Sequence, residues 1–205
     1  MAAGEKYRFS FTAGSSQLAD FTRLAKMVVE ADYELDRIKR DDVGKDKEST
    51  NQRHFQELRI RLGHLTSEEI DLLADGDLND KKYVTLLALC KSYKFILDFV
   101  VEVVREKALV YDFEIRESDY NSFINRKIYD HPELEELSES TKDKIKQVLF
   151  RILAEVGLID NAKSRVIQHI LIAPKLNNIV RKDNPELLKI FLKPDREIKE
   201  ATNAN

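Results

Sequence analysis

A basic stripe is predicted on one side of an amphipathic helix that begins at Ser140 or Thr141. Lys144, Gln147 and Arg151 follow the i, i+3, i+7 spacing of one side of a helix. Apolar residues follow the spacing of the opposite side, which should pack on the core: Ile145, Val148, Leu149, Ile152, Leu153 and Val156. Long cationic and amide side chains reach phosphates and base edges when a helix lies in a DNA groove. The stripe therefore has the residue types for nucleic-acid binding, although any solvated helix face shows the same pattern.

Charge is distributed unevenly along the chain. Residues 141–193 contain eleven basic and five acidic residues, a net charge of +6. Because the whole chain carries −3, the remainder carries −9. The candidate DNA-binding surface combines the stripe with its basic neighbours: Lys142, Lys144, Lys146, Gln147, Arg151, Lys163 and Arg165. Two further candidate patches are Arg126-Lys127 and a stripe of Arg53, Arg59 and Arg61.

The end of the basic helix resembles the end of a winged helix-turn-helix. Gly157 is placed to end the helix, and Leu158-Ile159 should turn back onto the core. After a polar turn, the β-branched pair within Arg165–Gln168 is compatible with a small extended element. In winged helices the recognition helix closes with a similar Gly-Leu-Ile and leads into a wing that touches the DNA backbone. The resemblance implies a recognition helix followed by a basic wing.

Catalytic motifs are missing from the sequence. It has no Gly-rich phosphate loop, no Gly-x-Ser-x-Gly and no His-Glu-x-x-His. The histidines stand alone without metal-ligand spacing, at His54, His64, His131 and His169. Cys90 lies in an apolar run without a second Cys or a His nearby, which favours inert core. We therefore expect no enzyme activity, no metal, no cofactor and no small-molecule substrate.

The composition predicts an all-α fold. Six Gly and four Pro in 205 residues are few, whereas strands joined by tight turns need both residue types. A single cysteine excludes an internal disulfide and suits a reducing cytoplasm. No run approaches the ~20 apolar residues of a membrane span. We expect a cytoplasmic, compact multi-helix domain with no membrane association.

The element pattern supports that fold. Residues 80–108 are apolar on nearly every side and predict a central helix, with Tyr93 as the point where it could break. Thr66 and Glu69 fit a capping box, and a helix ending at Gly63 precedes them. This spacing fits a helix-turn-helix or a plain packing hairpin. The charged run 41–48 predicts an exposed loop, and Ser118 could cap a helix that runs to Tyr129.

Residues 7–194 are expected to form one all-helical domain. An N-terminal subregion at 7–76 and a winged-helix-like subregion at 118–193 could be distinguished within it, and the polar tail 195–205 should fray.

Short blocks spread along the chain share the pattern of one bacterial family. The blocks are YRFSFTAGS (7–15), LLADGD (72–77), VEVVREK (101–107), FINRK (123–127), HPEL (131–134), STK (140–142), QVLFRIL (147–153) and GL (157–158). Together they resemble the BrxA family, the small core component of BREX bacteriophage-exclusion systems. The resemblance spans nearly the whole chain, from residue 7 to about 192, and leaves out the 41–48 loop and the tail.

The resemblance implies an all-helical protein with helix-turn-helix elements that binds double-stranded DNA. It also implies partners within BREX, a DNA methyltransferase and ATPases, and the family has been compared with RNA-binding antitermination factors. The expected function is therefore non-catalytic binding of duplex DNA, mainly through phosphates. One alternative is a scaffold that recruits other defence proteins through its acidic part, and the other is RNA binding.

Overall fold

The structure is a computed structural model that describes residues 6–39 and 48–203 of the chain. These residues form helices joined by short turns, so the predicted all-α fold is confirmed. In chain order the elements are η1 (Ser10–Ala13), α1 (Leu18–Glu30), η2 (Leu35–Arg37), α3 (Glu48–Gly63), α4 (Ser67–Asp75), α5 (Leu78–Ser92), α6 (Lys94–Phe99), the π-helical η3 (Val100–Arg105), α7 (Glu106–Leu109), α8 (Glu117–Asp130), η4 (Pro132–Leu134), α9 (Glu139–Glu155), α10 (Pro174–Asp183), η5 (Pro185–Phe191) and α11 (Asp195–Asn203). The predicted 41–48 loop lies outside the described residues except for Glu48.

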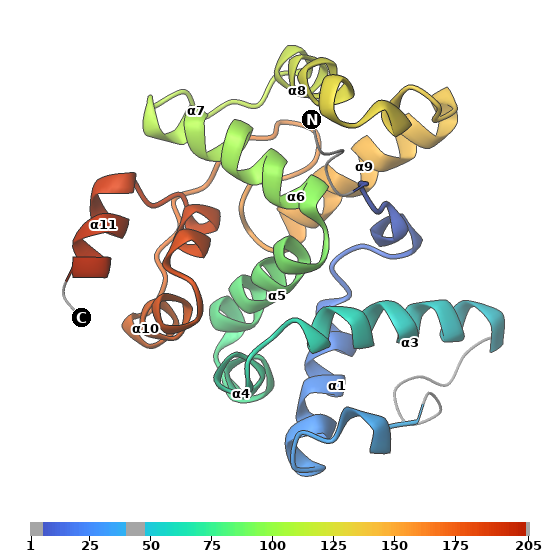
Figure 1. Ribbon diagram of the computed structural model, residues 1–205, viewed down its shortest axis with the longest axis vertical. Coiled ribbons are helices and arrows are strands. Elements are labelled where there is room, and N and C mark those ends of the chain that lie inside the picture. Colours follow the sequence, from blue (N-terminus) through green and yellow to red (C-terminus); the bar gives the residue numbers. More distant parts are fainter. Residues whose placement is uncertain (1–5, 40–47, 204–205) are drawn as a thin grey trace.

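The apolar run at 80–108 forms the centre of the molecule. Helix α5 ends at Ser92, Tyr93 is extended (φ −132°, ψ 98°), and α6, η3 and α7 continue the path. The break predicted at Tyr93 is therefore confirmed. Side chains in this run are buried on all sides, including Leu87 and Phe95 at 0% exposure. Figure 1 shows the run crossing the middle of the molecule between two groups of helices.

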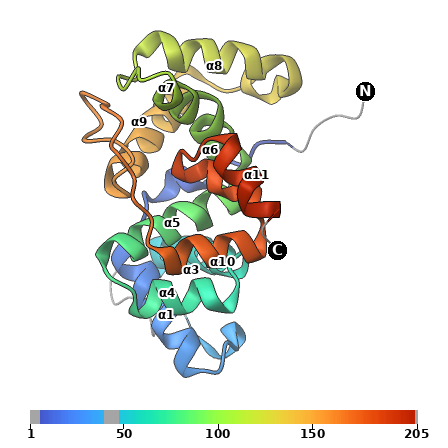
Figure 2. The same cartoon turned by 90° about the vertical axis from the view of Figure 1, so that its left-hand side faces the viewer.

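The other helices pack against this central run. Helices α1, α3 and α4 pack on α5 at one end, while α8 and α9 lie at the opposite end (Figures 1 and 2). The last elements, α10 and η5, return to pack on α4, α5 and η3, and α11 packs on η5. In the tail predicted to fray, α11 begins at Asp195 and buries Ile198 at 2% exposure.

The predicted capping box of α4 is present. The Thr66 hydroxyl accepts a hydrogen bond from the Glu69 amide at 3.3 Å, and the Glu69 carboxylate accepts one from the Thr66 amide at 2.8 Å. The turn from Gly63 to Thr66 therefore ends α3 and begins α4 within a few residues, as expected.

Three short extended segments lie beside α9. Glu114 and Val166 form one antiparallel bridge, and Ile159 and Ile167 form a second. The segment around 166–168 therefore lies between 113–115 and 158–160, and the extended element predicted after Arg165 is confirmed. The chain order at this end is a helix (α6 to α7), an extended segment, α8, α9 and an extended hairpin. In Figure 2 the orange hairpin projects from the body beyond α9.

Gly157 controls the exit from α9 into this hairpin. Its φ is +79°, the Leu158 amide donates to the Leu153 carbonyl at 2.8 Å, and the Gly157 amide donates to the Ala154 carbonyl at 3.1 Å. This pair of bonds is a Schellman motif, and Leu153 and Leu158 are both fully buried. The prediction that Gly157 ends the helix is confirmed.

Replacing Gly157 with Ala should lower the free energy of unfolding by about 1–2 kcal/mol, because an L residue is strained at positive φ. No atom lies within 4 Å of the added Cβ, so the cost comes from the backbone alone. Gly63→Ala is the matched control: its Cβ also meets nothing within 4 Å, and its φ is not positive. Urea unfolding should find Gly63→Ala unchanged or slightly more stable; equal losses in both variants would contradict the role of Gly157.

Candidate nucleic-acid interface

Helix α9 is anchored by its apolar face. Ile145, Leu149 and Ile152 are buried at 2% exposure or less, as the periodicity predicts. The N-cap is Ser138, whose hydroxyl accepts from the Thr141 amide at 3.3 Å, so the predicted start at Ser140 or Thr141 is two or three residues late. Likewise, α8 begins before Ser118: the Asp119 carboxylate accepts from the Arg116 amide at 2.7 Å.

The opposite side of α9 is exposed. Lys144, Gln147 and Arg151 all face solvent, and we call these three residues the α9 face. Within the described part of the chain, neither Lys144 nor Arg151 forms an ion pair. Their positive charges are therefore available to an external anion.

A groove of about 640 Å³ runs beside the α9 face. Its walls come from α9 and from the 160–165 turn of the hairpin: Ser140, Asp143, Lys144, Lys146, Gln147, Phe150, Ala162 and Arg165. The candidate DNA-binding surface predicted from the sequence has seven residues, and four of them lie in the walls of this groove. The structure therefore brings the basic helix and the predicted wing side by side.

The 160–165 turn is held by its own side chains. The Asp160 carboxylate accepts from the amides of Asn161 and Val166, at 2.6 and 2.8 Å, and from the Ser164 hydroxyl at 2.6 Å. The Ser164 hydrogen bond is the largest cause that lowers the pKa of Asp160, against the opposing effect of burial. The Asn161 side-chain oxygen accepts from the Lys163 amide at 2.8 Å. These bonds fix a turn from which the exposed Lys163 side chain projects.

Glu117 pairs with two of the predicted residues. Its two carboxylate oxygens lie 2.7 Å from Lys146 Nζ and 3.0 Å from Arg165 Nη1. Arg165 also lies 4.0 Å above the Phe150 ring, and its φ of +55° turns the side chain back toward α9. The hydrogen bonds from Lys146 and Arg165, the Lys146 bond first, lower the pKa of Glu117. Lys142 has a more exposed partner, Glu139, at 2.9 Å.

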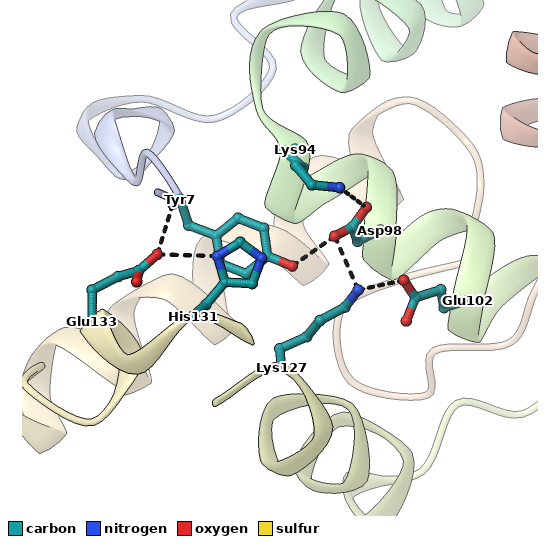
Figure 3. A network of polar contacts seen from close by, with 7 residues as sticks. All are labelled: Tyr7, Lys94, Asp98, Glu102, Lys127, His131 and Glu133. Atoms are coloured by element: carbon teal, nitrogen blue, oxygen red, sulfur yellow. Dashed lines mark hydrogen bonds and ion pairs between the residues drawn. The ribbon is translucent and has the colours of Figure 1, made fainter. Parts of the chain in front are cut away.

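The Arg126-Lys127 patch is divided. Arg126 is exposed, whereas Lys127 Nζ turns inward to Asp98 at 3.0 Å and to Glu102 (Figure 3). The prediction that Lys127 contacts DNA does not fit this geometry, because both carboxylates neutralise its charge. Sequence periodicity alone could not reveal these partners, which lie on α6 and η3.

Lys127 belongs to a polar network that joins the N-terminal segment to α6 and α8. The Tyr7 hydroxyl donates to Asp98 at 2.6 Å, and the Tyr7 amide donates to Glu133 at 2.8 Å. The Tyr7 ring stacks on His131 with ring centroids 3.6 Å apart (Figure 3). Burial raises the pKa of Asp98, but the hydrogen bonds from Tyr7, Lys127 and Lys94 outweigh it and hold that pKa below 3.8. The network is therefore charged and structural.

The stripe of Arg53, Arg59 and Arg61 is not one surface. Arg61 is fully buried, and its guanidinium donates to the main-chain carbonyls of Ser15 and Ser16 at 3.2 and 3.1 Å. This burial argues against the prediction that Arg61 contacts DNA, because the fold would have to open before Arg61 met a duplex. Arg59 pairs with the exposed Asp36 at 2.5 Å, and Arg53 is exposed.

Three other functional features can be assessed in the described residues: a metal site, a reactive cysteine and a membrane-spanning helix. No group of three or more His, Cys, Asp and Glu side chains there could hold a metal ion. Cys90 is buried, and burial raises the pKa of its thiol far above the usual value, which disfavours the thiolate that a nucleophile needs. No helix among these residues has the length and apolarity to cross a bilayer.

The fold and this surface define an all-α protein that exposes cations on one helix and on the turn beside it. Residues 5–184 match the sequence profile of the BrxA family. The chain belongs to the BrxA family, whose members are components of BREX phage-defence systems.

Two relatives support this assignment, and one solved structure shares the fold. The chain is 25% identical over 134 residues to the BREX protein BrxA of Escherichia coli O9:H4 (strain HS), covering 65% of this chain and 63% of that protein. It is 29% identical over 103 residues to BrxA of Bacillus cereus (strain H3081.97), covering 50% and 52%. The chain thus matches about half to two thirds of the length of these relatives. A crystal structure of an uncharacterized protein from Magnetospirillum magneticum shares the fold (TM-score 0.76, 20% identity, covering 92% of this chain and 99% of that one).

Replacing Lys127 with Met should lower the free energy of unfolding by about 1–3 kcal/mol, because Asp98 loses one partner while remaining buried. Arg126→Met, one position earlier and exposed, should change it by less than about 0.5 kcal/mol.

The ion pair between Lys127 and Asp98 also predicts that the free energy of unfolding depends on pH. The folded-state pKa of Asp98 lies below 3.8, so its ion pair stabilises the fold above that pH and is lost as the pH falls through the folded-state pKa. The stability difference between wild type and Lys127→Met should therefore shrink below about pH 3.8. A difference that stays constant in urea titrations from pH 7 to 3 would contradict the assignment.

Proposed function

We propose that this protein binds double-stranded DNA without catalysing a reaction, through the α9 face and the 160–165 turn. One observation carries the proposal: Lys144, Arg151 and Lys163 are exposed on α9 and the 160–165 turn, the two elements that line the groove, and they form no ion pair among the described residues. Phosphates attract such cations along the whole duplex, so the binding should be weakly sequence-specific.

The order of elements supports the same proposal. A helix, an extended segment, a second helix, a third helix and an antiparallel hairpin follow one another, with the last extended segment between the other two. This is the order of a winged helix-turn-helix, in which the third helix enters the major groove and the hairpin turn contacts the backbone. On this scheme α9 is the recognition helix, Gln147 faces base edges, and the 160–165 turn is the wing.

The groove is also physically suited to a duplex. Gln147 lies between Lys144 and Arg151 on the α9 face, so an amide that can bind base edges is flanked by cations that bind phosphates. The Arg165 guanidinium rests on Phe150 at the groove wall, which limits its motion before binding. Preordered cations lose less conformational entropy when a phosphate binds.

The double variant Lys144→Glu/Arg151→Glu should abolish duplex binding while leaving α9 helical, because both side chains are exposed. Fluorescence anisotropy with a labelled duplex at two salt concentrations measures the loss, and circular dichroism checks the helix. If wild type contacts about four phosphates, its log-log salt slope should be about −4.

Lys26→Glu/Lys199→Glu is the matched control, since it makes the same charge change at exposed lysines of α1 and α11. It should lose no more than a few-fold in affinity. Equal losses in the two double variants would mean that net charge alone drives binding. Stronger competition by duplex RNA than by duplex DNA would favour the RNA-binding alternative instead.

A second role, docking of another BREX component, is favoured by an exposed apolar cluster. Val110 and Tyr111 are 71% and 83% exposed, and the Tyr111 ring meets that of Phe113 edge to face at 6.3 Å. Large exposed aromatic groups of this kind are typical of protein interfaces. Membership of the BrxA family makes the methyltransferase and ATPases of BREX the expected partners.

Tyr111→Ser/Phe113→Ser should weaken co-purification with these BREX components at least tenfold and leave duplex affinity unchanged, because neither residue lines the groove. Tyr129→Ser removes an equally exposed aromatic ring on α8 and serves as the control. Unchanged co-purification of the double variant would exclude this cluster as the docking site.

A further inference from the structure

We propose that Lys146 and Arg165 form a phosphate-binding site that is closed in the free protein by the carboxylate of Glu117. The inference rests on the proposed function and deepens it, because it assigns the place where one DNA phosphate replaces an internal anion. Glu117 is then a competitor for that site and sets how tightly the duplex binds.

The geometry of Glu117 matches that of a bound oxyanion. One carboxylate oxygen lies 2.7 Å from Lys146 Nζ and the other lies 3.0 Å from Arg165 Nη1. The two cations come from different elements, α9 and the 160–165 turn, and the carboxylate comes from a third, the start of α8. Two oxygens bridging two cations is also how a phosphodiester would lie between them.

Both cations have supports that do not depend on Glu117. The Arg165 guanidinium lies 4.0 Å above the Phe150 ring, and its Nε donates to the Ala162 carbonyl at 3.2 Å. Lys146 Nζ lies 5.8 Å from the centre of the Tyr120 ring. Both side chains also line the groove beside the α9 face. Removing the Glu117 carboxylate should therefore leave both side chains in place at the groove, with Arg165 released from its ion pair and Lys146 facing only the more distant Asp143 carboxylate.

The internal anion is one that a phosphate can displace. The Glu117 side chain is 50% exposed, and ion pairs of this exposure are screened by water and salt. Asp143 also faces Lys146, with its carboxylate 3.7 Å away, and it remains when Glu117 moves aside. The duplex offers many phosphates close together, which compete far better than a free anion at the same concentration.

Glu117→Gln tests the proposal, because it removes the charge and keeps the size of the side chain. Glu114→Gln is the matched control: it makes the same charge change three residues earlier, on an exposed carboxylate that contacts neither Lys146 nor Arg165. Anisotropy should show duplex affinity rising about fivefold or more in Glu117→Gln, with a salt slope steeper by about 1, and rising by no more than about twofold in Glu114→Gln.

A second measurement separates this proposal from the proposed function. Sodium tripolyphosphate, followed by calorimetry, should bind Glu117→Gln more tightly than Glu114→Gln, and the gain should vanish in Glu117→Gln/Arg165→Gln. If no variant binds a duplex but Glu117→Gln still gains affinity for tripolyphosphate, the anion site is supported and the proposed DNA binding is contradicted. If Glu117→Gln gains nothing over Glu114→Gln with either probe, or binds more weakly than wild type, Glu117 is not a competitor and the proposal is overturned.

Discussion

Ion pairing between distant elements decides which basic residues of this protein can act on a partner. Lys127 and Arg165 both lie in segments that look basic, yet Asp98 neutralises the first and Glu117 the second. Lys144 and Arg151 lie on the same helix as Lys146, but they are more exposed and form no ion pair among the described residues, whereas Lys146 pairs with Glu117 of α8. The proposed binding surface therefore depends on which carboxylates approach α9 as much as on the lysines and arginines of that helix.

The N-terminal segment holds that arrangement in place. Tyr7 joins α6 to the turn after α8, and the Ser16 amide and hydroxyl donate to Glu155 at the end of α9 at 2.9 and 2.6 Å. Arg61 of α3 donates hydrogen bonds to the main-chain carbonyls of Ser15 and Ser16 in the same segment. One short segment thus connects the helices around α5 to the helices that present the groove, so that the two groups keep a fixed orientation.

Local sequence signals predicted the elements well, because helix periodicity, caps and glycines act over a few residues. The buried face of α9, the capping box at Thr66 and the exit at Gly157 all follow from neighbours within one or two turns. The errors have a different origin. Arg61 was assigned to a surface because nothing near it in sequence reveals the carbonyls at Ser15 and Ser16. Glu117 was missed because its partners lie 29 and 48 residues away.

The acidic total charge of −3 is compatible with a DNA-binding face. The affinity for DNA depends on the local electrostatic field at that face, and the charge on the rest of the protein determines how a duplex is oriented as it approaches. In the proposed binding, a duplex that approaches the acidic remainder would be repelled and one that approaches the α9 face would be attracted, so few orientations would be productive. The binding expected from this charge distribution is weak and directed, and other proteins could strengthen it. Weak binding of DNA would suit a component of a multi-protein defence system. Stable binding to DNA would then require the partner proteins as well, because the contacts of this protein alone would be too weak.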